Sequence, residues 1–130
     1  MTKKLLTITM TNRPPIRIDS ANWSVIARSV WYEGSFECQA NRRSYLKVLE
    51  HGDGRRIVYG EYMSLWQGER DRSAGVLLAA PAGDAETVAA IRSVAAVLEA
   101  CDDDDDDPRT RYPSCLADAC IADLPPEDLV

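Results

Sequence analysis

The sequence lacks most of the residues that catalytic and metal sites use. It has a single histidine, His51, and its four cysteines include no C-x-x-C pair. Zinc modules rely on such short spacings, so the cysteines are expected to be reduced thiols that bind no metal. The P-loop, the G-x-S-x-G elbow, the G-x-G-x-x-G turn and the H-E-x-x-H helix are also missing. We therefore expect neither an enzyme nor a cofactor.

Long apolar segments are missing as well. No run approaches the roughly 20 apolar residues that a transmembrane helix needs. Lys3 and Lys4 have the charge of a secretory leader, but Thr7, Thr9 and Thr11 interrupt the apolar stretch that should follow them. The sequence predicts an intracellular protein with no membrane partner.

Charge is distributed unevenly along the 130 residues. Residues 1–98 hold 13 Lys and Arg against 10 Asp and Glu, whereas residues 99–130 hold 2 against 11. A mildly basic body thus precedes a strongly acidic C-terminal quarter, within a total charge of −6. Such asymmetry indicates an interaction surface or a tail.

The central part of the chain predicts a long β-hairpin from about residue 43 to residue 66. Gly52-Asp53-Gly54 separates two arms rich in β-formers, and an Asp-Gly pair in this setting is a strong hairpin signal. A three-residue loop with Gly54 left-handed sets Glu50 opposite Arg56. A two-residue turn would slip the register by one residue and swap the faces of one arm.

Other segments are shorter and simpler. Alternation predicts a strand over residues 4–11, and further strands are expected at 16–18 and 36–40. A short apolar run bounded by Gly75 and Pro81 predicts another strand at 75–80. An apolar stripe at helical spacing predicts a helix from Asp19 or Ser20 to Gly34; its members are Trp23, Ile26, Ala27, Val30 and Trp31. Further helices are expected from Asp84 to about Cys101, and from Ser114, with Leu116, Ala119, Cys120 and Leu124 facing inward.

These elements predict one α+β domain. We expect an antiparallel sheet of four to six strands, built around the hairpin, with helices packed on one face. Residues 1–101 would form the body and residues 102–113 an acidic linker. Residues 114–130 would form a helical segment that docks on the body, because a disordered tail would lack its apolar side chains.

The acidic quarter is the leading candidate for a partner-binding site. Its densest part is the aspartate run, consisting of Asp102, Asp103, Asp104, Asp105, Asp106 and Asp107, with Asp118 and Asp123 following. Clustered carboxylates attract cationic grooves, including those that hold nucleic acid. A solvated linker without a specific role is the alternative, in which case exposed aromatic residues such as Trp66 and Tyr112 would hold the partner. The run lacks the alternating ligands of a calcium loop.

A second candidate is contact between the body and nucleic acid. Six arginines occur in pairs near aromatic residues: Arg42, Arg43, Arg55, Arg56, Arg70 and Arg72. Phosphates bind such side chains. Acidic residues are interleaved with them, and a net charge of +3 over 98 residues is not a basic footprint.

Several phrases resemble small uncharacterised proteins of bacterial phages and mobile elements. The phrases are Arg13–Asp19, Glu37–Arg42, Asp53–Gly60, Trp66–Arg70 and Cys120–Asp128. The resemblance spans most of the chain but skips the aspartate run, and none of the phrases is a motif with a known mechanism. Some proteins of this size and setting are anti-CRISPR proteins, several of them acidic mimics of DNA. The resemblance thus implies a non-enzymatic cytoplasmic inhibitor that blocks a cationic nucleic-acid site on a CRISPR effector complex. The alternative is an accessory or regulatory protein of a mobile element whose Arg-rich body contacts nucleic acid.

Overall fold

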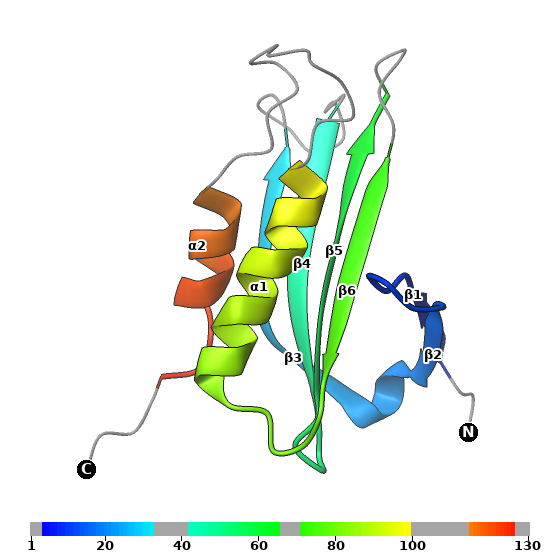
Figure 1. Ribbon diagram of the computed structural model, residues 1–130, viewed down its shortest axis with the longest axis vertical. Helices are drawn as coiled ribbons and strands as arrows, with labels where there is room; N and C mark the ends of the chain where they lie inside the picture. Colours follow the sequence, from blue (N-terminus) through cyan, green and yellow to red (C-terminus); the bar gives the residue numbers. More distant parts are fainter. Residues whose placement is uncertain (1–3, 33–41, 66–70, 100–114, 127–130) are drawn as a thin grey trace.

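The fold is α+β, as the sequence predicts. The computed structural model describes residues 4–32, 42–65, 71–99 and 115–126, in which a four-stranded antiparallel sheet has the order β3-β4-β5-β6 and β1 pairs separately with β2. The strands are β1 (Leu5–Ile8), β2 (Ile16–Asp19), β3 (Trp23–Tyr32), β4 (Arg42–His51), β5 (Arg56–Ser64) and β6 (Arg72–Leu78). The helices are α1 (Asp84–Glu99) and α2 (Cys115–Ala122), and both cover the same face of the sheet (Figure 1).

The central hairpin forms in the predicted register. Glu50 pairs with Arg56 and Val48 with Val58 across β4 and β5. Gly54 has a φ of 97°, and its amide donates to the His51 carbonyl at 2.9 Å. A left-handed glycine at the end of a three-residue loop therefore fixes which side chains face each side of the sheet.

The helix predicted from Asp19 or Ser20 to Gly34 is wrong. Asp19 caps only the short 3-10 turn Ser20–Asn22, and the chain then enters strand β3, which pairs with β4 along its length. The register shifts between Val25 and Ala27, which marks a β-bulge at Ile26. The five apolar residues of the supposed stripe lie on both faces of the strand: Ile26, Ala27 and Trp31 pack on the helix side, Trp23 packs with the β1–β2 hairpin and Val30 is exposed. The extra residue at the bulge interrupts the simple alternation of a strand, so the sequence shows helical spacing instead. The strand is then favoured by its pairing with β4 and by its many β-branched and aromatic residues.

The helices bury their apolar sides against one face of the sheet. Leu46, Val48, Val58 and Tyr62 of the hairpin lie in this core with Ile91, Val94, Ala95 and Leu98 of α1 and with Leu116, Ala117 and Cys120 of α2. On this side of α1, Ile91, Val94, Ala95 and Leu98 are buried and Val88 is half-buried. In α2 the expected inward position Ala119 is exposed and Ala117 is buried in its place. The sheet side of the helices is thus a continuous apolar layer.

The opposite face of the sheet is only partly covered. The β1–β2 hairpin packs Leu6, Ile8, Ile16 and Ile18 against Leu49, Ile57 and Tyr59. It also reaches the free edge of β6, where the Thr11 amide donates to the Gly75 carbonyl at 2.8 Å. A Cβ on Gly75 would lie 2.7 Å from the Thr9 carbonyl oxygen, so glycine is required for this close approach.

Arg56 fastens the central hairpin to the start of α1. Its guanidinium donates to Glu50 at 2.8 Å, to Asp84 at 3.0 Å and to the Thr87 hydroxyl at 2.9 Å. Its side chain is 12% exposed. Burial alone would lower the pKa of Arg56, but the hydrogen bonds and charges of Glu50 and Asp84 raise it overall. The guanidinium therefore remains charged and pairs with both carboxylates.

The predicted strand at 36–40 lies outside the described residues.

Candidate partner-binding site

Two of the ten predicted contact residues lie in the part of the chain that the structure describes. These are Asp118, within α2, and Asp123, directly after it. Asp102 to Asp107, Trp66 and Tyr112 lie outside the described residues. By sequence, the aspartate run belongs to the connection between α1 and α2.

Asp118 lies on the exposed side of α2, which begins at Cys115 and buries Leu116 and Ala117 beneath it. Its carboxylate forms an ion pair with Arg92 of α1 at 3.2 Å, and both side chains are more than half exposed. Exposed pairs of this kind contribute only about 0–1 kcal/mol, so Asp118 remains available to a partner.

Asp123 has a structural contact. Its carboxylate accepts a hydrogen bond from the backbone amide of Arg28 at 2.9 Å. Arg28 belongs to β3, which is an edge strand of the four-stranded sheet. Beside it, the Ser29 hydroxyl donates to the Leu116 carbonyl at 2.8 Å. These two bonds attach α2 to the edge strand, and Asp123 blocks an amide that another strand would otherwise pair with.

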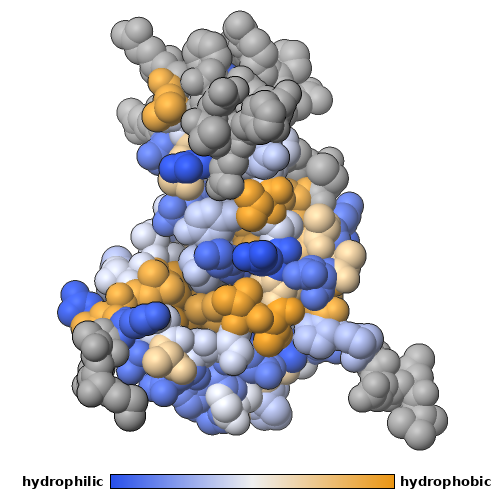
Figure 2. Space-filling view, turned by 180° about the vertical axis from the view of Figure 1, so that it is seen from behind, coloured by the Kyte–Doolittle hydropathy of each residue, from blue (hydrophilic) through white to orange (hydrophobic). Residues whose placement is uncertain are grey.

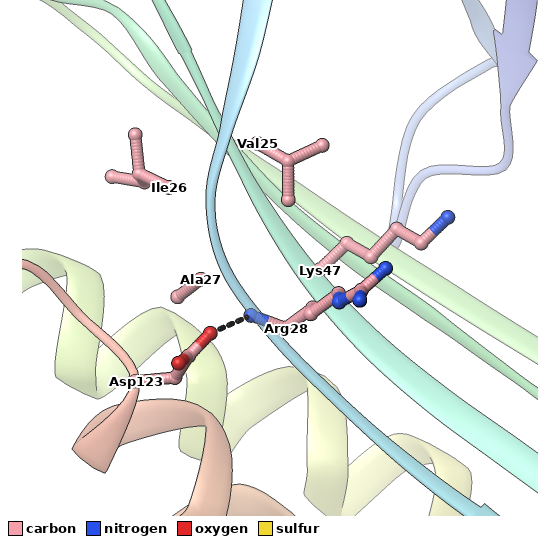
Figure 3. Close-up of a pocket in the computed structure, with 6 residues that line it drawn as sticks. All are labelled: Val25, Ile26, Ala27, Arg28, Lys47 and Asp123. Atoms are coloured by element: carbon pink, nitrogen blue, oxygen red, sulfur yellow. Dashed lines mark hydrogen bonds between the residues drawn. The ribbon is translucent and has the colours of Figure 1, made fainter.

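A shallow pocket of about 340 Å³ lies where Asp123 meets the β3 bulge. Its lining consists of Val25, Ile26, Ala27, Arg28, Lys47 and Asp123. Figure 3 shows that Arg28 and Lys47 extend to the same side of β3, away from Asp123 and the helices. The pocket is therefore a notch at the sheet edge, with acidic and basic groups on different sides of the strand.

Acidic residues predominate on the helical side of the sheet. Among described residues, α1 carries Asp84, Glu86 and Glu99 against Arg92, and Asp118 and Asp123 belong to or follow α2. In the full sequence, residues 84–130 hold 13 Asp and Glu against 3 Arg. The aspartate run thus joins two helices that are already acidic and that contact each other and the sheet.

Four of the six arginines proposed for nucleic-acid contact are occupied within the protein. Arg56 holds Glu50 and Asp84, while Arg55 bonds Asp53 and lies 5.3 Å from the centre of the Trp23 ring. Arg42 is 6% exposed, and the guanidinium of Arg72 lies 4.5 Å from the centre of the Tyr62 ring. Arg70 lies outside the described residues, and Arg43 is exposed. Only Arg43 among the described members therefore suits the proposed role.

Cations that the sequence analysis missed lie beside Arg43 on the uncovered sheet face. Arg28 of β3 pairs directly with Lys47 of β4, and Arg43 of β4 pairs with Tyr32. The Lys47 ammonium lies 5.1 Å from the centre of the Tyr45 ring. Burial, followed by the nearby Glu61 and Tyr59, raises the pKa of Tyr45, so its hydroxyl stays neutral. Reading residues 23–32 as a strand would have placed Arg28 on this face.

His51 has no catalytic partner among the described residues. Its Nδ1 accepts the Asp53 amide at 3.1 Å, and its ring lies edge-on to Trp23 with centroids 5.0 Å apart. The Asp53 carboxylate also lies 3.2 Å from Nδ1, a contact that becomes an ion pair only if the ring is protonated. Because Nδ1 accepts the Asp53 amide, it serves as an acceptor within the turn. The pKa of Asp53 is lowered mainly by the backbone amide of Arg55. The cluster stabilises the hairpin tip.

Neither a metal centre nor a membrane span is found in the described residues. They contain no group of three or more His, Cys, Asp and Glu side chains placed to hold a metal ion. None of the described helices is both long and apolar enough to cross a membrane. Cys120, the cysteine whose side chain is described, is buried and free. Burial, with a smaller contribution from Asp123, raises the pKa of its thiol to about 11.

Comparisons with protein-family models, with curated proteins and with solved structures found no match.

Proposed function

We propose that this protein is a non-enzymatic binding protein that presents its acidic helical side to a cationic groove on a protein partner. The partner class is a CRISPR effector complex in the bacterial cytoplasm, and the action is that of an anti-CRISPR-type inhibitor. The carboxylates would occupy the surface that otherwise holds nucleic-acid phosphates. The protein would belong to a phage or another mobile element.

The observation that carries this proposal is the anchoring of the acidic run at both ends. α1 packs against β5 and β6, and α2 packs against β3, β4 and α1. The 15 residues between Glu99 and Cys115 therefore start and finish on the same face of the sheet. Anchoring limits the volume that six aspartates can occupy, which raises their charge density relative to a free tail.

The two described aspartates divide into different roles under this proposal. Asp118 contributes to the acidic surface, because its ion pair with Arg92 is exposed and exchangeable. Asp123 acts indirectly, because its carboxylate attaches the end of α2 to the edge strand. Its removal would loosen the anchor of the acidic run.

The test uses two full-length variants, one that removes the negative charge of the aspartate run and one that keeps it. In the first, Asp102 to Asp107 are all replaced by Ser; in the second, all six are replaced by Glu. Each protein is immobilised and exposed to lysate from bacteria that carry CRISPR effectors, and association with the captured effector is then measured at low and moderate salt. Carboxylate steering predicts slow, salt-insensitive association for the Ser variant and parental behaviour for the Glu variant.

Two results would contradict the proposal. Parental binding by the Ser variant at both salt concentrations would exclude the aspartate run as the active surface. Loss of binding in the Glu variant, with unchanged thermal stability, would show that the partner recognises something other than negative charge.

A further inference from the structure

The uncovered part of the sheet carries a compact group of cations on the side opposite the helices. Arg28, Arg43 and Lys47 all project from it, and strongly hydrophilic side chains cross the middle of this side in Figure 2. Apolar surface lies above and below that band (Figure 2). We propose that this area, here called the basic face and consisting of Arg28, Val30, Tyr32, Arg43, Tyr45 and Lys47, binds single-stranded nucleic acid. It is a second site, separate from the acidic helical side.

The first argument is the unfavourable pairing of Arg28 with Lys47. These two residues are direct cross-strand partners, and like charges in such positions destabilise a sheet because their Cβ atoms are only about 5 Å apart. Within the described ranges, no carboxylate forms an ion pair with Arg28, Arg43 or Lys47. Glu61 accepts a hydrogen bond from the neighbouring Tyr45 hydroxyl instead. A bound phosphate would relieve the repulsion between the two cations.

The second argument is the alternation of cations with an aromatic ring along β4. Arg43, Tyr45 and Lys47 occupy alternate positions, so their side chains share one face at intervals of about 6.7 Å. Tyr45 pairs with Val30 and Arg43 with Tyr32 on β3, and Val30 is 51% exposed. A ring beside cations on a sheet surface lets a base stack while the adjacent phosphates are neutralised.

These features favour a single strand over the alternatives. A duplex keeps its bases stacked inside, so it would contact the cations without using Tyr45 or the apolar side chains. An acidic protein segment would also use the cations, but it offers no flat π-surface to the ring. The basic face can act only if the nucleic acid exposes its bases.

The experiment measures fluorescence anisotropy of a labelled 12-nucleotide deoxythymidine strand with the full-length protein. Three phosphate contacts predict a slope of about −2 for log affinity against log salt, which is about 20-fold weaker binding at 200 mM than at 50 mM salt. The double variant Arg28→Ser/Lys47→Ser should reduce the slope to about −0.7. Tyr45→Leu keeps an apolar side chain in the sheet and should weaken binding about fivefold or more.

The matched control is Arg92→Ser, compared with Arg28→Ser. Both changes remove one exposed arginine, but Arg92 belongs to α1 on the other side of the sheet. Arg28→Ser should weaken binding while Arg92→Ser leaves it unchanged, at equal thermal stability. The proposal is overturned by absent binding at 50 mM salt, by equal affinity for a 12-base-pair duplex, or by polyglutamate competing as well as the unlabelled strand. Replacing the aspartate run does not remove the basic face, so the two proposals can fail independently.

Discussion

Gly60 should be the position at which the smallest substitution does the most damage to the fold. It lies in β5 opposite Leu46, under the C-terminal part of α1. An added Cβ would lie 2.5 Å from the Tyr45 carbonyl oxygen and 3.0 Å from a methyl carbon of Leu98. Real Cβ atoms do not approach other heavy atoms more closely than 3.0 Å. The first contact is the decisive one, since a backbone carbonyl in a central strand cannot turn away.

The magnitude follows from two opposing effects of Gly60→Ala. Overpacking a well-packed site costs about 3 kcal/mol, whereas losing the freedom of glycine in the unfolded chain returns about 0.7 kcal/mol. The net loss of about 2 kcal/mol corresponds to a decrease in Tm of about 8 °C for a domain of this size. The change should be measured by circular dichroism during heating and by urea unfolding.

Gly52→Ala is the matched control, because a Cβ at Gly52 meets nothing within 4 Å and its φ is not positive. Its unfolding free energy should be unchanged or slightly raised. The double variant Gly60→Ala/Leu98→Ala should not recover stability, because removing the Leu98 side chain leaves the carbonyl contact and adds a cavity. A Gly60→Ala protein as stable as the parent would refute this account of how α1 approaches the sheet.

Three further outcomes are expected. Arg56→Met should lower the free energy of unfolding by about 2 kcal/mol, because it leaves two carboxylates without their shared cation. Arg55→Met at the exposed tip should change the free energy of unfolding by less than about 0.5 kcal/mol. Equal effects of the two substitutions in urea titrations would contradict this expectation. Asp123→Ala should cost about 1 kcal/mol by freeing the edge amide, whereas Asp123→Asn keeps an acceptor and should be close to the parent. The raised pKa of the Cys120 thiol, about 11, means that the folded state disfavours the thiolate. The contribution of the protonated thiol to the free energy of unfolding is complete below pH 9 and is lost as the pH rises towards 11. Cys120→Ala should therefore reduce the fall in Tm between pH 8 and pH 10.5.

The central hairpin could be predicted from the sequence in detail. An Asp-Gly turn flanked by β-formers locates the hairpin, and the left-handed conformation expected of Gly54 favours the three-residue loop over a two-residue turn. The observed register confirms that choice and decides the faces of Val48, Val58 and Tyr62. Local chemistry is sufficient there because the partners are adjacent in sequence. The strands at residues 5–8 and 16–19 and the helix from Asp84 follow the same logic.

Strand β3 could not be identified from its pattern alone. A bulge at Ile26 replaces simple alternation with a shifted one, and the shifted pattern coincides with helical spacing. Its pairing with β4 depends on residues that are distant in sequence, which a local sequence window does not include. This error also hid the basic face, because Arg28 meets Lys47 only when residues 23–32 form a strand.

The candidate acidic site was predictable as composition but not as geometry. The sequence locates six aspartates and their charge, whereas the contacts of Asp118 and Asp123 depend on where α2 docks. The arginine pairs show the same limit: Arg55 and Arg56 are adjacent in sequence, yet one stabilises the hairpin tip and the other holds α1. Arg55 belongs to the hairpin turn and Arg56 begins β5, so proximity in sequence does not imply a shared site.

The most direct measurement of the central proposal is competition between this protein and target DNA for an isolated CRISPR effector complex. Labelled DNA bound to the effector should be released as the protein is added, and effector that is already saturated with DNA should not bind the protein. The Asp102 to Asp107→Ser variant should release little DNA, while the Glu variant should match the parent. Simultaneous binding of protein and DNA, each with unchanged affinity, would contradict the account.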